Sequence, residues 1–206
     1  MKWIYLSPHF DDAVLSCGGL IWEQIQAGNQ VEVWTVCAGV PHAELPLSQY
    51  ARNLHECWQI GPEPVNDRRL ENIAAIAELG ALCCEWDLPD CIYRRLPDST
   101  FVVNSNDDLW LPVRQQENEV IARLRGWLEA RLIPEDRLVC PISVGNHMDH
   151  RLTRAAAEAM DRTLWYYPDY PYVATAPASL TAFLQPAWSK ECFCISIRGL
   201  EAWQRA

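Results

Sequence analysis

The predicted fold class follows from one stretch near the N-terminus, Trp3-Ile4-Tyr5-Leu6-Ser7-Pro8-His9-Phe10-Asp11-Asp12. Its first four residues form an apolar, largely aromatic and β-branched run that stops before Pro8, which is typical of a short buried strand. An imidazole and two carboxylates follow within four residues. Because ligands bind at the carboxyl ends of strands in open α/β sheets, this cluster is the first candidate for a functional site.

The chain beyond this stretch predicts a βαβ unit. Residues 13–19 (AVLSCGG) lead into a helix expected over 20–27, with Gly18 and Gly19 before it and Gly28-Asn29 after it. The run 31–36 then predicts a second strand. A strand, a helix and a strand within about thirty residues indicate parallel pairing. We therefore predict an α/β fold with a mostly parallel sheet.

The rest of the chain continues this pattern. Helical spacing of apolar residues over 48–59 places His55 near an apolar face, which favours a structural role for it. A helix is predicted over 67–79, with its N-cap at Asn66 or Asp67 and its stop at Gly80, because Leu70, Ile73, Ala74 and Ala77 form one helical stripe. We further predict strands at 81–86 and 137–144, helices at 114–131 and 152–159, a loop region beside the site at 87–112, and a tail after 165 that forms a strand and loops.

Composition limits the classes of function. The chain has 206 residues, enough for one full-sized core, and we expect a single domain over 1–206. A net charge of −10 argues against binding to nucleic acid, whose phosphates attract Lys and Arg. The sequence contains no membrane span and no signal-peptide pattern, which predicts a cytoplasmic protein. The nine cysteines lack zinc-knuckle spacing and are expected to be buried, reduced thiols.

A second polar cluster, Gly145-Asn146-His147-Met148-Asp149-His150, follows the predicted strand 137–144. Parallel strands place their carboxyl ends on one edge of the sheet, so the two clusters can form a single site. Catalytic zinc takes three protein ligands and leaves one position for water. His9, Asp12 and His150 could supply these ligands, and Asp11 could then accept the proton of the water.

The other residues of the second cluster have candidate roles of a different kind. His147 and His150 are three residues apart and need not both be ligands, because amide hydrolysis also requires a group that stabilises the oxyanion or protonates the amine. We assign His147 to that role. Asp149 could orient one of the imidazoles.

The motifs carry a family resemblance. Pro8-His9-x-Asp11-Asp12, Leu15-Ser16-Cys17-Gly18-Gly19 and His147-x-Asp149-His150 resemble those of the PIG-L/LmbE-like zinc-dependent N-deacetylases. The similarity extends through Arg68-Arg69-Leu70-Glu71, Leu79-Gly80-Ala81 and the stretch 166–172. It implies a Rossmann-like three-layer sandwich and removal of an acetyl group from an N-acetylglucosamine-type sugar or conjugate.

Residue by residue, the resemblance implies the zinc ligands His9, Asp12 and His150, the general base Asp11 and the acid or electrophilic group His147. It also implies Arg68 and Asp90 as substrate-binding residues. Phe10 stands where the family usually has proline, Ala13 where an acidic residue is common and Asn146 where glycine is common. Phe10 puts the choice of substrate in question, whereas none of these positions is a ligand.

Two other functions compete with a zinc-dependent deacetylase. One is a catalytically silent or sugar-binding paralogue. The five catalytic positions are all filled, which argues against this alternative. The other is a nucleotide-binding Rossmann domain, which lacks the Gly-x-Gly-x-x-Gly turn after the first strand. The sequence leaves open the exact substrate, the acyl-chain length, zinc or ferrous iron (Fe2+) as the native ion, and the oligomeric state, with a homo-oligomer among the alternatives.

Overall fold

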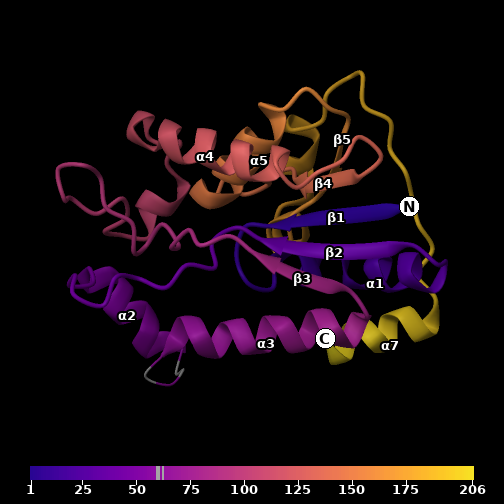
Figure 1. The fold of residues 1–206 in the computed structure, drawn as a ribbon, viewed down its shortest axis with the longest axis horizontal. Helices are drawn as coiled ribbons and strands as arrows, with labels where there is room; N and C mark the ends of the chain where they lie inside the picture. Colours follow the sequence, from indigo (N-terminus) through magenta and orange to yellow (C-terminus); the bar gives the residue numbers. More distant parts are fainter. Residues whose placement is uncertain (59–60, 62) are drawn as a thin grey trace.

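A computed structural model describes residues 1–58, 61 and 63–206, and within them one parallel sheet organises the chain. Its strand order is β3-β2-β1-β4-β5 (Figure 1). The strands are β1 (Lys2–Ser7), β2 (Gln30–Thr35), β3 (Leu82–Glu85), β4 (Arg137–Pro141) and β5 (Leu164–Tyr167). The chain starts in the middle, moves out to β3 and returns to β4. The neighbours β1 and β4 therefore lie where the direction of winding reverses, the position at which such sheets bind ligands.

Helices cover both faces of the sheet, as Figure 1 shows. On β1, Trp3 and Tyr5 join the core beneath α1, α3 and α7, while Ile4 and Leu6 join the core beneath α4 and α5. This alternation confirms the predicted α/β three-layer sandwich. The helices are α1 (Asp12–Gln26), α2 (Gln49–Trp58), α3 (Pro64–Leu79), α4 (Asn118–Glu129), α5 (Met148–Glu158), α6 (Tyr172–Thr175) and α7 (Ile197–Arg205), with 3-10 turns at Asp107–Trp110, Gln115–Glu117 and Pro177–Ala182.

The first helix begins earlier than the sequence predicted. Helix α1 starts at Asp12, so Gly18 and Gly19 lie inside it and not before a helix over 20–27. A Cβ atom on Gly18 would lie 2.3 Å from Cδ1 of Trp203 in α7. The glycines thus allow α7 to pack closely on α1. The tail was predicted to form a strand and loops, so α7 was missed. This short helix packs on α1, which is distant in the sequence.

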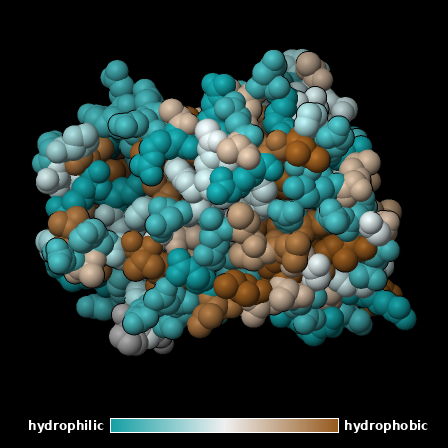
Figure 2. Space-filling model, in the orientation of Figure 1, coloured by the Kyte–Doolittle hydropathy of each residue, from teal (hydrophilic) through white to brown (hydrophobic). Residues whose placement is uncertain are grey.

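Helix α3 is longer than predicted and presents a different face to the core. Its N-cap is Glu63 and Pro64 occupies the first turn, so the prediction of an N-cap at Asn66 or Asp67 was wrong. The apolar stripe that indicated the helix does not face the core, since Leu70 is 67% exposed and the buried residues are Asn72, Ile76 and Leu79. Figure 2 shows apolar surface over α3. The helix buries Asn72 instead, because the Asn72 amide is held by hydrogen bonds to groups beneath it.

Strand β4 ends at Pro141, three residues before the predicted end at residue 144. Ser143, Gly145 and Asn146 have φ values of 67°, 88° and 66°, which break the extended backbone. Helix α5 then starts at Met148, earlier than the predicted helix over 152–159. The second polar cluster therefore spans a turn and the first turn of a helix.

Other predictions had mixed outcomes. Strand 81–86, helix 114–131 and the loop region 87–112 match the structure in place and type. Helix 48–59 matches α2, although its last residue, Gln59, lies outside the described residues. Cys57, Cys192 and Cys194 are exposed, contrary to the expectation of burial, while all nine cysteines are free thiols. In the described part of the chain, we find no helix with the length and apolar character needed to cross a membrane.

Candidate metal and catalytic site

The turn after β1 points its two carboxylates in different directions. Asp11 caps the N-terminus of α1 with a left-handed φ of 79°, a conformation that Asp adopts more readily than most residues. The backbone N–H of Asp11 donates to Oδ1 of Asn72 at 3.2 Å. Asp12 turns inward, where its Oδ2 accepts a bond of 2.8 Å from the backbone N–H of His9. Asp11 remains half exposed, 3.6 Å from Nη2 of Arg68.

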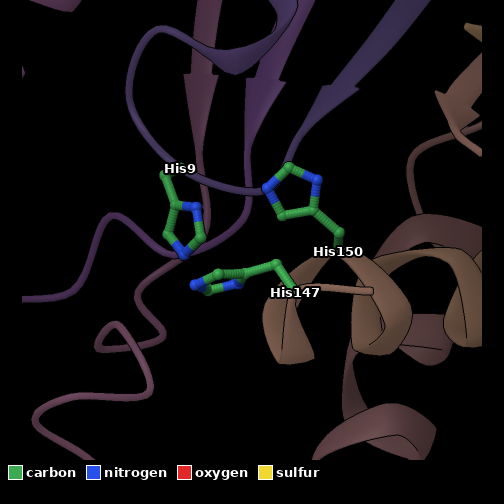
Figure 3. A group of neighbouring side chains, drawn as sticks. All are labelled: His9, His147 and His150. Carbon is green, nitrogen blue, oxygen red and sulfur yellow. The ribbon is translucent and has the colours of Figure 1, made fainter. Parts of the chain in front are cut away.

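The second cluster meets the first because β1 and β4 are neighbours. His147 is the N-cap of α5 and its Nδ1 accepts the backbone N–H of Asp149 at 3.3 Å. His150 lies in the first turn of the same helix. Figure 3 shows the rings of His9, His147 and His150 gathered at one place, and donor atoms of these three rings lie within 4.8 Å of one another.

Three electron-pair donors converge on a single point. Oδ2 of Asp12 lies 3.2 Å from Nδ1 of His9 and 3.3 Å from Nε2 of His150. The opposite ring nitrogens each face another carboxylate: His9 Nε2 is 3.0 Å from Asp149 and His150 Nδ1 is 2.5 Å from Asp169. If these outer nitrogens donate their protons, the inner ones present lone pairs toward Asp12. Such a donor set fits a cation.

The site holds its titratable groups in distinct states. Burial and the neighbouring Asp12 raise the pKa of Asp11 to about 6. Burial and the neighbouring His9 lower the pKa of His147 to about 4, so this ring is neutral at pH 7. Burial also lowers the pKa of His150, but Asp12 and Asp169 outweigh it and raise the value to about 9. The raised pKa of His150 indicates a strong negative electrostatic potential at the point where the lone pairs converge.

A buried charged network supports the site from below. Nη2 of Arg94 lies 2.6 Å from Oδ1 of Asp149, and Nε of Arg94 donates to Glu117 at 2.8 Å. The backbone N–H of Cys91 donates to Oδ2 of Asp149 at 2.9 Å. Asp149 is fully buried and Arg94 is nearly so. The network therefore fixes the carboxylate that contacts His9.

Comparison with known proteins identifies the family. The family model described as PIG-L: GlcNAc-PI de-N-acetylase matches residues 4–160. The chain belongs to the PIG-L family. This PIG-L protein is 28% identical over 200 residues to a 2'-N-acetylparomamine deacetylase from Niallia circulans, covering 90% of the chain and 71% of the relative.

Solved structures show the same fold. A deacetylase–teicoplanin complex from the teicoplanin biosynthesis pathway has a TM-score of 0.77 and 25% identity, covering 100% of this PIG-L chain and 84% of the other. The zinc-inhibited form of teicoplanin deacetylase Orf2 has a TM-score of 0.73 and 25% identity, covering 100% and 83%. These matches confirm the family resemblance drawn from the motifs.

All eight predicted site residues of this PIG-L protein lie in one region. His9, Asp11, Asp12, His147, Asp149 and His150 form the cluster described above. Arg68 reaches it through Asp11, and its guanidinium lies 5.0 Å from the ring centre of Trp58. Oδ2 of Asp90 lies 3.6 Å from Nε2 of His9.

Three residues that position this site were missed. Asp169 lies two residues after the end of β5, in the stretch 166–172, so the strand-end argument applied to the first two clusters also pointed to it. Arg94 lies in a loop without periodicity, and Asn72 lies on a helix face that was assigned wrongly. Aromatic residues also border the cluster: Trp110 lies 5.6 Å from His147 and Tyr172 lies 5.8 Å from His150, between ring centres.

Proposed function

We propose that this PIG-L protein is a metal-dependent hydrolase that removes an N-acetyl group from an N-acetylglucosamine-type amino sugar or sugar conjugate. The observation that carries the proposal is the convergence of His9 Nδ1, His150 Nε2 and Asp12 Oδ2, with the carboxylate of Asp11 outside this set and paired with Arg68. The relatives named as deacetylases of paromamine and teicoplanin compounds support the choice of an amino-sugar conjugate.

His9, Asp12 and His150 would hold the ion, with zinc as the first candidate and ferrous iron as the second. The zinc-inhibited relative supports the presence of a metal site. The alternative set of three histidines fits less well, because Nδ1 of His147 already accepts a backbone N–H. A divalent ion in such a site acts as a Lewis acid and lowers the pKa of a bound water to about 7.

Asp11 is placed to accept the proton of the attacking water. Its side chain is 53% exposed, and a pKa of about 6 leaves it mostly ionised at pH 7 while still able to hold a proton. Arg68 stands 3.6 Å away and favours the ionised form before attack. The proton that Asp11 receives is then available for a later step.

His147 is placed to donate a hydrogen bond. Because its Nδ1 accepts the backbone N–H of Asp149, the neutral ring carries its proton on Nε2. The lowered pKa keeps the ring in this neutral form. An N–H donor stabilises the carbonyl oxygen as this oxygen gains negative charge, and it can then donate a hydrogen bond to the departing amine. Arg68 and Asp90 are proposed to bind the sugar hydroxyls.

Two substitutions test the proposal through separate measurements. Asp11→Asn should keep the bound metal, by elemental analysis, and reduce acetate release from N-acetylated amino-sugar conjugates by about 10²- to 10⁴-fold. His150→Ala should lose the metal. His42→Ala, at an exposed histidine outside the cluster, is the matched control and should change neither the metal content nor the rate of acetate release.

Two results would count against the proposal. Full activity of Asp11→Asn would reject the assignment of the base, and unchanged metal content of His150→Ala would reject the ligand. A metal-loaded wild-type protein that releases no acetate from a panel including N-acetylated paromamine and glycopeptide conjugates would favour the silent paralogue.

A further inference from the structure

His9 presents a second nitrogen to a second group of donors. Its Nε2 faces away from Asp12 and lies 3.0 Å from Oδ2 of Asp149 and 3.6 Å from Oδ2 of Asp90. The thiol of Cys37 completes the group, because donor atoms of His9, Cys37 and Asp149 all lie within 4.8 Å of one another. Cys37 follows β2 and is 3% exposed. The proposed deacetylation uses neither this thiol nor this side of the imidazole as a ligand.

A small cavity leads to the same group. It has a volume of about 10 Å³, and His9, Cys37 and Asp90 contribute to its wall. A space of this size holds about one water molecule, and so it also suits a single ion. Asp90 lines the cavity, and the carboxylate of Asp149 contacts the His9 ring that forms part of its wall. Arg68 also lines the cavity, so the two carboxylates outnumber the one cation there and favour a bound cation over an anion.

We propose that this cavity is a second metal site, selective for a thiophilic divalent cation such as cadmium or excess zinc. Its ligands are Nε2 of His9, Sγ of Cys37 and Oδ2 of Asp149, with Asp90 as the fourth donor. A mixed set of nitrogen, sulfur and oxygen donors suits these ions. On binding, the thiol proton and the Nε2 proton of His9 pass to solvent, so that His9 becomes an imidazolate that would bridge the two ions, and no electron is transferred.

A neighbouring thiol provides a matched control. Donor atoms of Cys91, His147 and Asp149 also lie within 4.8 Å of one another, so Cys91 is another soft donor near the same carboxylate. However, Cys91 is fully buried and does not contribute to the cavity wall. Of these two thiols, Cys37 is the one that both belongs to a donor group and lines the cavity. The site therefore depends on Cys37 and not on Cys91.

Occupation of the second site should inhibit deacetylation. The bond from Nε2 of His9 to Asp149 orients Nδ1 toward Asp12, and a cation on Nε2 replaces that bond. This consequence rests on the proposed function, whereas binding of the second ion does not.

Cadmium titration tests the site directly. The background protein carries Ser in place of the five thiols that are not buried, so that accessible cysteines do not contribute to the signal: Cys57, Cys83, Cys84, Cys192 and Cys194. We expect two cadmium ions per chain and an ultraviolet thiolate-to-cadmium charge-transfer band. Cys37→Ala should lose the band and bind one ion, and Cys37→Val, which fills the thiol's volume, should do the same. Cys91→Ala should keep both ions and the band.

A further variant separates the two proposals. His150→Ala should lose the ion that His9, Asp12 and His150 share and keep the charge-transfer band, so failure of one proposal is distinguishable from failure of the other. For excess zinc, the inhibition constant of Cys37→Ala should rise at least about tenfold. A background protein without the band, or a band that persists in both Cys37 variants, would overturn the second site.

Discussion

Replacing Arg94 with Met should strongly destabilise the metal-free protein. The side chains of Arg94, Asp149 and Glu117 are 7%, 0% and 4% exposed, so the substitution leaves two buried carboxylates without their cation. Breaking a buried ion pair by removing one partner costs about 3–5 kcal/mol. For a chain of this size the loss corresponds to a fall in Tm of roughly 6–20 °C. The loss of free energy of unfolding can be measured by urea unfolding followed by circular dichroism, in the presence of a chelator.

The destabilisation should also depend on pH. Burial raises the pKa of Asp149, but Arg94 and His9 outweigh it and hold the value well below the usual one. A depressed carboxyl pKa contributes stability above its unfolded value of about 4, and this contribution is lost as the pH falls through the folded value. The difference between wild type and Arg94→Met should therefore be largest near pH 7 and shrink in acid.

A surface arginine provides the control. Arg125 pairs with Glu129 at 2.7 Å, but both side chains are nearly half exposed. Arg125→Met should cost no more than about 0.5 kcal/mol. If Arg94→Met loses no more free energy of unfolding than Arg125→Met, or if its deficit grows toward acid pH, the network does not support the site as argued.

Two further predictions concern the metal and the helix packing. Asp169→Asn should weaken metal binding by about 10- to 100-fold in a competition titration, because Asp169 orients His150; unchanged affinity would exclude that role. Gly18→Ala should lower the free energy of unfolding by about 1–3 kcal/mol through the clash with Trp203, whereas Gly126→Ala, in open space on α4, should raise it by up to about 1 kcal/mol. Equal melting temperatures for the two variants would contradict the packing argument.

Local patterns were sufficient to predict the sheet and the cluster. A strand and the polar residues that follow it are close in the sequence, so the positions of His9 just after β1 and of His150 in the segment after β4 could be inferred from the sequence. Parallel pairing then requires these ends to share an edge. The same argument extends to Asp169 after β5, where it was not applied.

Contacts between distant segments could not be predicted in this way. The face of α3 was assigned from apolar spacing, yet the helix buries Asn72 because that amide has partners at Asp11 and Thr35. The buried face also carries the apolar residues Ile76 and Leu79, so apolar spacing alone did not distinguish it from the exposed face. Arg94 has no pattern around it, and its importance comes from two carboxylates, at 117 and 149, that only the fold brings near.

The backbone at Asp11 explains how two adjacent carboxylates can have different roles. If Asp11 continued the helix, the helix geometry would fix its carboxylate about 100° around the axis from that of Asp12. The left-handed conformation at Asp11, supported by Asn72, turns its carboxylate toward Arg68 and solvent while Asp12 faces the two imidazoles. The proposed division into ligand and base therefore depends on Asn72, whose side chain accepts from the backbone of Asp11 and donates to Thr35.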